Sequence, residues 1–212
     1  MTKIEAVLFD MDGVLIEAKD WHYEALNKAL KLFGMDISRH EHETTFDGLP
    51  TRKKLEMLTN EKGLPSQLHE FINHMKQKYT MDIVQMNCKP TFNHEYALSK
   101  LKYDGFKMAV CSNSIRNTIE VMMKNASLDS YFDFYISNED VVMSKPDPEM
   151  YTKAINKMNL KPLQCMIIED NENGIKAARA SGANVMIVEK INDVNYLNIK
   201  KNIIKFEGNT ND

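Results

Sequence analysis

The sequence is poor in cysteine and has no long apolar run. Its three cysteines, Cys88, Cys111 and Cys165, are odd in number, widely spaced and set mostly among apolar residues. This pattern predicts buried free thiols and argues against a disulfide framework or a zinc site. No apolar stretch approaches the roughly 20 residues that span a bilayer, and no basic segment followed by an apolar one stands at the N-terminus. We therefore expect no membrane partner and a cytoplasmic location.

The sequence also lacks a strong charge of either sign. Its 27 Lys and Arg residues against 30 Asp and Glu residues give a formal net charge of −3. The basic run Arg52-Lys53-Lys54 is short and typical of a solvated helix face, so a nucleic-acid partner is not expected. There is no internal repeat and no low-complexity segment. A chain of 212 residues is long enough for a core domain with a small inserted one.

What the sequence does contain is a short apolar run that ends in two carboxylates. Val7-Leu8-Phe9 is typical of a strand buried on both faces of a parallel sheet, and Asp10 follows at its carboxyl end. In open α/β sheets, ligands bind at that edge. Asp12 stands one residue further on, so a turn can bring both carboxylates to one point, where they repel unless a cation or a phosphate site separates their roles. Taken alone, the Asp-Gly pair is equally typical of an ordinary turn.

Apolar residues at helical spacing, without any strand signal, fill the stretch that follows. They predict three helices, over about 20–33, 51–62 and 65–79. This stretch is interpreted as an all-helical cap domain, residues 16–87, inserted after the first strand.

From about residue 94 the pattern alternates between helix and strand. Strands are predicted over 107–111, 134–136, 165–168 and 185–188, and helices over 94–103, 115–125, 148–158 and 174–180. Such alternation implies right-handed crossovers and a parallel sheet covered on both faces. The predicted fold class is α/β, with a Rossmann-like doubly wound parallel sheet core formed by residues 1–15 and 88–212. The tail beyond Asn192 is expected to fray at its end.

One later strand end and one later loop carry groups suited to binding phosphate. Ser112 follows the strand predicted over 107–111, and its hydroxyl and neighbouring amides could hold phosphate oxygens, with further donors from Asn113. Alone, such a serine is more typical of a turn or a helix cap. Lys145 lies in Ser144-Lys145-Pro146-Asp147-Pro148, whose prolines stiffen the loop and fix the direction of the ammonium group.

A second pair of acids repeats the design of the first strand. Glu169 and Asp170 end the apolar run Met166-Ile167-Ile168. Carboxylates at one sheet edge suit Mg²⁺, which prefers hard oxygen ligands together with water and phosphate oxygens. We expect Asp170 to bind the metal directly, and Glu169 either to bind it directly or to contact one of the direct ligands.

These groups form four motifs along the chain, which are Asp10 with Asp12, then Ser112, then Lys145, and last Glu169 with Asp170. In this order the motifs resemble those of the haloacid dehalogenase-like hydrolase superfamily, over roughly residues 3–190. The resemblance implies that Asp10 is a nucleophile that forms an aspartyl-phosphate. It implies that Asp12 is the general acid and then the general base, with its backbone carbonyl on the metal. Lys145 would clamp the phosphate and screen Asp10. Asn171 stands where the family more often has Ser, which puts one outer hydrogen bond in doubt. The implied ligands of the Mg²⁺ cofactor are Asp10, Asp12, Asp170 and Glu169.

The helical insertion resembles the small cap of the branch that contains phosphoglycolate phosphatases, sugar-phosphate phosphatases and β-phosphoglucomutase. Residues 46–52 are similar to the cap's specificity loop, where Arg52 either reaches an anionic or polar substrate or merely begins a helix. His22 occupies the position at which relatives similar to hexose-phosphate mutases carry a histidine that faces the acid/base aspartate. The resemblance implies a Mg²⁺-dependent phosphatase of a small phosphorylated metabolite, such as a sugar, polyol or similar phosphomonoester.

Two alternatives stay open. A β-phosphoglucomutase-like mutase would use the same residues, but Glu17-Ala18 stand where mutase-like sequences often carry Asp-Thr, so a hydroxyl that helps to set the conformation of Asp12 is missing. A non-catalytic binding protein on this fold would be expected to have lost a motif, and all four are filled. We expect a monomer or a weak dimer.

Overall fold

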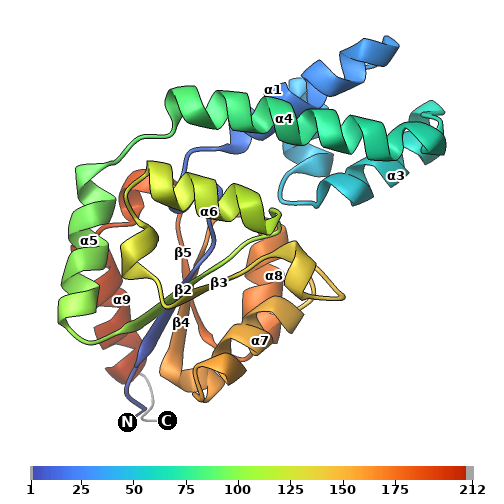
Figure 1. Ribbon diagram of the computed structural model, residues 1–212. Coiled ribbons are helices and arrows are strands. Elements are labelled where there is room, and N and C mark those ends of the chain that lie inside the picture. Colours follow the sequence, from blue (N-terminus) through green and yellow to red (C-terminus); the bar gives the residue numbers. More distant parts are fainter. Residues whose placement is uncertain (1, 209–212) are drawn as a thin grey trace. The chain divides into compact units, whose positions relative to one another are not determined.

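A computed structural model describes residues 2–208 of the chain (Figure 1). The chain divides into two compact units. One is formed by Met1–Glu17 together with Lys89–Asp212, and the other by Ala18–Cys88. The inserted unit therefore spans 18–88, against the 16–87 expected from the sequence.

The first unit is built around a parallel sheet with the strand order β3-β2-β1-β4-β5. The strands are β1 (Ala6–Phe9), β2 (Lys107–Cys111), β3 (Phe134–Ile136), β4 (Cys165–Glu169) and β5 (Asn184–Ile187). Strand β1 is central, and its Leu8 stands opposite Ala109 on β2 and Ile167 on β4. All four residues of β1 are buried, as its uninterrupted apolar sequence predicts for a strand covered on both faces. The prediction of a Rossmann-like α/β core is confirmed.

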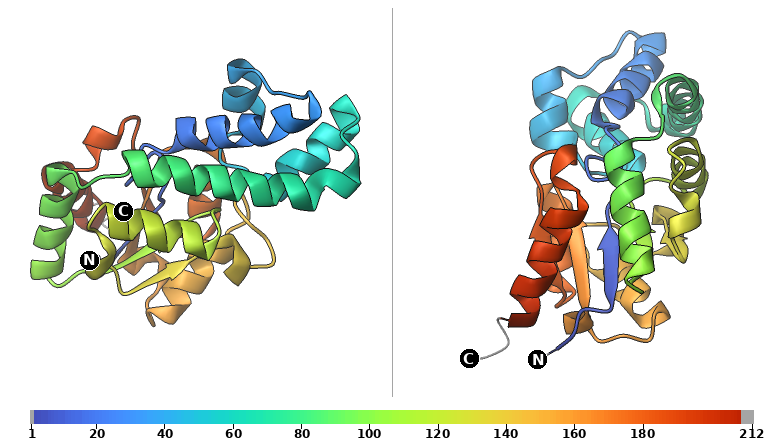
Figure 2. Two further views of the ribbon diagram at one scale, coloured as in Figure 1. Left: turned by 45° about the horizontal axis from the view of Figure 1, so that its top comes forward. Right: turned by 90° about the vertical axis from the view of Figure 1, so that its left-hand side faces the viewer.

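Helices cover both faces of this sheet. They are α5 (Phe92–Tyr103), α6 (Arg116–Asn125), α7 (Glu149–Lys157), α8 (Glu172–Ala180) and α9 (Tyr196–Gly208). Helices α5 and α9 lie side by side on one face, and α7 and α8 lie on the other (Figures 1 and 2). Strand ends and helix termini therefore meet at the carboxyl edge of the sheet, where the sequence places its polar motifs.

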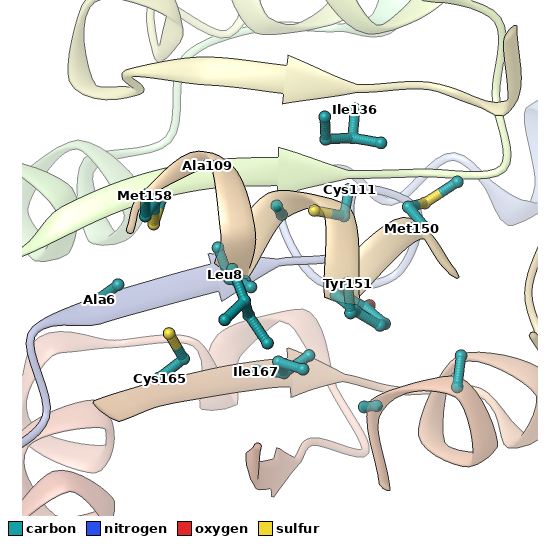
Figure 3. Packing of buried hydrophobic residues seen from close by; sticks show 14 residues of the cluster. Ala6, Leu8, Ala109, Cys111, Ile136, Met150, Tyr151, Met158, Cys165 and Ile167 are labelled. Carbon is teal, nitrogen blue, oxygen red and sulfur yellow. The ribbon is translucent and has the colours of Figure 1, made fainter. Parts of the chain in front are cut away.

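The core under α7 and α8 joins the sheet to these helices (Figure 3). Leu8, Cys111 and Ile167 point from three neighbouring strands toward Tyr151 and Met150 of α7. All three cysteines of the chain are buried and free, as predicted.

The inserted unit, taken by itself, consists of helices. They are α1 (Lys19–Leu30), α2 (Arg39–Glu41), α3 (Thr51–Lys62) and α4 (His69–Asn87), with short helical turns at Lys31–Phe33, His42–Phe46 and Ser66–Leu68. Helix α3 has the predicted bounds and ends at Gly63, whose φ of 71° is left-handed. Helix α4 runs eight residues past the predicted end at Tyr79, because Thr80 and Val84 continue the buried face of Ile72.

The tail of the chain departs from the prediction. Helix α9 was not expected, yet it buries Ile199 and Ile203 against the unit. Residues 209–212, where fraying was expected, lie outside the described residues. Within residues 2–208, no helix combines the length and the apolar character needed to cross a membrane.

Candidate active site

The chain turns back immediately after Asp10. The Asp10 N–H donates to the Ile168 carbonyl at 3.0 Å, which continues the pairing of β1 with β4. Beyond it, the Gly13 N–H donates to the Ile16 carbonyl at 2.7 Å, and Gly13 has a φ of 90°. Residues that carry a side chain rarely adopt that backbone conformation, whereas glycine adopts it at little cost in free energy and so closes the turn. The turn keeps Asp10 and Asp12 at the same sheet edge.

Asp12 accepts a hydrogen bond from a residue on the next strand end. The Ser114 hydroxyl donates to Asp12 Oδ2 at 3.3 Å. Ser114 was not among the predicted site residues. Its position two residues after Ser112 was the available signal, but a second serine after a strand is more often part of a turn.

The ammonium group of Lys145 lies between two buried carboxylates. Its Nζ donates to Asp10 Oδ1 at 2.6 Å, to Glu169 Oε1 at 2.7 Å and to the Cys111 carbonyl at 2.7 Å. Burial alone would lower the pKa of this lysine, but attraction to Asp10 and Glu169 outweighs it and raises the pKa above its usual value. Lys145 is therefore held as a cation at the predicted nucleophile.

Asp10 is a buried carboxylate with other acids close to it. Its pKa is raised well above the usual value, first by burial and then by repulsion from Glu169, while Lys145 acts in the opposite direction. Asp170 and Asp12 add smaller repulsions. One ammonium group does not balance this many carboxylates, so a divalent cation here would relieve the repulsion.

Three of the carboxylates are arranged as a metal site requires. Asp10, Glu169 and Asp170 each offer a ligand oxygen, and these oxygens lie within 4.8 Å of one another. Hard oxygen donors at this spacing suit Mg²⁺. The side chain of Asp12 is not in this group; the sequence-based expectation for Asp12 concerned its backbone carbonyl. The residues present fit the metal that the motifs imply.

Glu169 is the most enclosed of these carboxylates. It is fully buried, and the Tyr151 hydroxyl donates to its Oε1 at 2.5 Å. The side chain of Asn171 caps the N-terminus of α8 by accepting a hydrogen bond from the Gly174 N–H at 3.0 Å. Asparagine and serine are comparable N-cap residues, so this cap does not require a serine at position 171. Tyr151 was not predicted, because from the sequence it is one more large residue on the buried face of a helix.

Ser112 and Asn113 follow β2, as predicted. Ser112 is buried, and its Oγ accepts from the Ser114 N–H at 3.1 Å. The side-chain amide of Asn113 donates to the Lys145 carbonyl at 3.2 Å and accepts from the Lys145 N–H at 3.1 Å. This side chain therefore fastens the lysine loop to the end of β2, and its phosphate contact remains a prediction.

The two predicted substrate residues of the inserted unit stand on different helices. His22 lies on α1, with its Nδ1 3.3 Å from the Nζ of Lys76 on α4. Arg52 lies in the first turn of α3, where its side chain is 89% exposed and donates to Glu56 at 3.1 Å. Their roles toward a substrate remain predictions.

The fold and the site together define a class of protein. It is an α/β enzyme whose central parallel strand ends in a buried aspartate, faced by a lysine and by acids suited to a divalent cation. Within this class the chain belongs to the haloacid dehalogenase-like hydrolase family, whose model matches residues 7–188. The resemblance stated from the four motifs is confirmed.

Known proteins similar to this chain carry related names. A phosphorylated carbohydrates phosphatase of Thermotoga maritima is 26% identical over 195 residues, which cover 90% of this chain and 88% of that protein. A phosphoglycolate phosphatase of Aquifex aeolicus is 27% identical over 179 residues, covering 84% and 82%. The crystal structure of a β-phosphoglucomutase from Clostridium difficile matches with a TM-score of 0.84 at 22% identity, over 97% of this chain and 99% of that one. At this identity the last likeness concerns the fold.

Proposed function

We propose that this chain is a Mg²⁺-dependent phosphatase that hydrolyses a small phosphorylated metabolite through an aspartyl-phosphate on Asp10. The observation that carries the proposal is the 2.6 Å contact between Lys145 Nζ and Asp10 Oδ1 at a carboxylate-rich sheet edge. A carboxylate attacks a phosphate only when cations screen the repulsion between them. Lys145 supplies one such cation beside the predicted nucleophile.

Two successive transfers account for the reaction. Asp10 attacks phosphorus and forms the aspartyl-phosphate, while Asp12 protonates the leaving oxygen of the alcohol. Asp12 then removes a proton from water, the hydroxide attacks phosphorus, and release of phosphate restores the Asp10 carboxylate. The Ser114 hydroxyl, 3.3 Å from Asp12 Oδ2, helps to orient the acid and base. Ser112 and the backbone amides around Asn113 hold phosphate oxygens.

The metal would be held by this chain's own acids. Asp10, Asp170 and Glu169 supply carboxylate oxygens, and the backbone carbonyl of Asp12 is the further ligand that the family resemblance implies. When bound, Mg²⁺ supplies positive charge that screens the negative charges of Asp10 and the phosphate from each other.

The substrate class rests on family membership and on the names of the relatives. A hydrolase of this family whose relatives include a phosphorylated carbohydrates phosphatase and a phosphoglycolate phosphatase is assigned to phosphorylated substrates. A sugar, polyol or similar phosphomonoester is the finer proposal. His22 and Arg52 of the inserted unit are proposed as substrate contacts.

A mutase is the second candidate, because the fold matches a β-phosphoglucomutase with a TM-score of 0.84. A mutase needs the same nucleophile, acid and cation, and differs in returning the phosphoryl group to a sugar in place of water. Ala18 speaks against this reaction, because it lacks the hydroxyl that mutase-like sequences often carry there.

The test is a screen of phosphate release from small phosphorylated metabolites, with and without Mg²⁺, that includes β-glucose 1-phosphate with an isomerisation readout. Asp10→Asn is run beside the wild type. Mg²⁺-dependent release that Asp10→Asn abolishes supports the proposal. Isomerisation without release identifies a mutase, and silence with every substrate favours a binding protein on this fold. Activity that survives Asp10→Asn contradicts the mechanism.

A further inference from the structure

A buried tyrosine contacts a carboxylate at the centre of the site but has no role in the reaction proposed above. Tyr151 lies on α7, and its side chain has no solvent exposure. Its hydroxyl donates to Glu169 Oε1 at 2.5 Å. A phenol at this depth needs a hydrogen-bond acceptor, and here the acceptor is a carboxylate of the proposed metal site.

The ring of the same tyrosine lies beneath the lysine of the site. Lys145 Nζ is 4.7 Å from the centroid of the Tyr151 ring and 2.7 Å from Glu169 Oε1. An ammonium group over an aromatic face is attracted by the ring quadrupole, and more strongly where water is excluded. One side chain therefore supports both the cation and one of the anions of the site.

The two oxygens of Glu169 consequently differ. Oε1 accepts from both Tyr151 and Lys145. Oε2 has weaker neighbours, the Asp170 N–H at 3.2 Å and the Asn171 side-chain amide at 3.5 Å. Because both hydrogen bonds to Oε1 are shorter than either contact to Oε2, Oε2 is the oxygen more readily available to a cation.

The carboxylate of Glu169 is also packed against the backbone of α8. A Cβ placed on Gly174 of α8 would lie 2.0 Å from Glu169 Oε1 and 2.2 Å from Oε2, so the carboxylate is seated directly against the glycine backbone. Tyr151, Lys145 and Gly174 thus enclose Glu169 from three elements of the fold.

We propose that Tyr151 is a positioning residue of the metal site: its hydroxyl holds Glu169 Oε1 so that Oε2 is presented, with Asp10 and Asp170, to the divalent cation. The inference rests on the proposed Mg²⁺-dependent function and deepens it. Residues that orient metal ligands contribute about 10- to 100-fold to metal affinity in other proteins. The phenol of Tyr151 is the group of this kind nearest to Glu169 that can be removed without changing a charge.

Calorimetric titration of Mg²⁺ into the full chain, without substrate, measures this contribution. Tyr151→Phe keeps the ring beneath Lys145 and removes only the hydroxyl, and we expect a dissociation constant about tenfold higher. Tyr135→Phe, at a half-buried tyrosine of β3, is the matched control and should change it less than twofold. Near-ultraviolet circular dichroism checks that each variant is folded.

A double-mutant cycle separates positioning from a general effect on the fold. Glu169→Gln removes the charge that Tyr151 is proposed to aim, so Tyr151→Phe should change the dissociation constant less than twofold in that background. A tenfold loss in both backgrounds overturns the inference, because Tyr151 would then act through something other than Glu169. Wild-type affinity in Tyr151→Phe overturns it as well and leaves the proposed function standing. Failure of the wild type to bind Mg²⁺ contradicts both.

A second measurement uses the wild-type sequence, which avoids any folding defect of a variant. With 3-fluorotyrosine at the eight tyrosine positions, the fluorine resonance of Tyr151 should shift when Mg²⁺ is added, because its hydrogen-bond acceptor becomes a metal ligand. A spectrum in which no tyrosine signal responds to Mg²⁺, under conditions where calorimetry detects binding, contradicts the inference.

Discussion

Glu169 lies so close to Gly174 that a side chain at that point of α8 would displace its carboxylate. A Cβ on Gly174 would come within 2.0 Å of Glu169 Oε1. Glycine inside a helix usually weakens it by up to about 1 kcal/mol relative to alanine, and α8 accepts that cost at a position where the carboxylate needs the space.

Gly174→Ala is therefore expected to weaken Mg²⁺ binding by at least about tenfold and to lower stability by about 2 kcal/mol, although alanine is the better helix former. Gly208→Ala is the matched control, because nothing lies within 4 Å of a Cβ at that position of α9, and it should be neutral or slightly stabilising. Calorimetry and urea unfolding give both quantities. An alanine variant as stable and as metal-binding as the wild type would show that Glu169 can relocate freely.

Lys145→Met removes the ammonium group from between Asp10 and Glu169 and leaves two buried carboxylates without their cation. We expect a loss of about 3 kcal/mol in the free energy of unfolding without metal, and a fall in kcat of at least about 100-fold. Adding Glu169→Gln to Lys145→Met should restore part of the stability, since one of the stranded charges is then gone.

The control for this variant is Lys176→Met, which breaks an exposed pair with Glu172 on α8 and should change stability by less than about 0.5 kcal/mol. If Lys145→Met and Lys176→Met proved equally harmless in urea unfolding, the carboxylates of Asp10 and Glu169 would not need the Lys145 ammonium group in order to stay buried.

Ser114→Ala deletes the hydroxyl that donates to Asp12 Oδ2. Because the proposed acid and base then loses one group that orients it, kcat should fall about tenfold while KM changes less than twofold. Ser181→Ala, whose hydroxyl bonds the Ala178 carbonyl at the far end of α8, serves as the control. In an Asp12→Asn background the further effect of Ser114→Ala should vanish. An unchanged fold loss there would argue that Ser114 acts on the phosphate or on the fold.

His42 of the inserted unit gives a pH-dependent prediction. Among the described residues, neither of its ring nitrogens has a hydrogen-bond partner, and its side chain is buried against the Tyr23 ring. Burial, and next Lys54, lower its pKa from 6.5 to about 4. Between these two values the unfolded chain binds the proton and the folded chain does not, so stability falls as the pH falls from 6.5 toward 4, by roughly 2–3 kcal/mol.

His42→Phe should remove this loss. We expect the variant to be about 1 kcal/mol more stable at pH 7.5, because two buried polar atoms without partners are gone, and the gain should grow by about 2 kcal/mol at pH 5. His40→Gln replaces an exposed histidine two residues away and is the control. Urea unfolding followed by far-ultraviolet circular dichroism at both pH values gives the free energies of unfolding to be compared. A gain that does not grow between pH 7.5 and pH 5 would count against the lowered pKa.

Much of the sheet could be predicted because β1, β2 and β3 are short, mainly apolar runs that are followed directly by a polar residue, and β4 is an apolar run that ends in Glu169. The bounds of β2 and β3 match the prediction, and those of β4 differ by one residue. Helix α9 escaped prediction because its apolar face rests on few residues, notably Ile199 and Ile203, set among asparagines and lysines. Its stability comes from packing on the sheet, which local spacing does not express.

The candidate site divides in the same way. Asp10, Lys145 and Glu169 could be found from the sequence because strand ends and proline-rich loops mark them, and the structure brings their charged groups together. Tyr151 could not be found, since its significance lies in a distance to a carboxylate 18 residues later in the chain. Asn113 was expected to face phosphate, and the bond of its side chain to the Lys145 backbone depends on how two loops meet.

The position of β1 between β2 and β4 has a consequence for biosynthesis. Among the strands of the sheet β1 is made first, yet one of its two hydrogen-bonding neighbours, β4, is made only at Cys165–Glu169. Until that segment has left the ribosome, β1 keeps an open edge, and Asp10 lacks Asp170, an acid of the proposed metal site. A chain that ends before β4 is therefore prone to edge-to-edge association along β1 and also lacks two of the three acids of the proposed metal site, so this site and the cover of β1 arise together with the fourth strand.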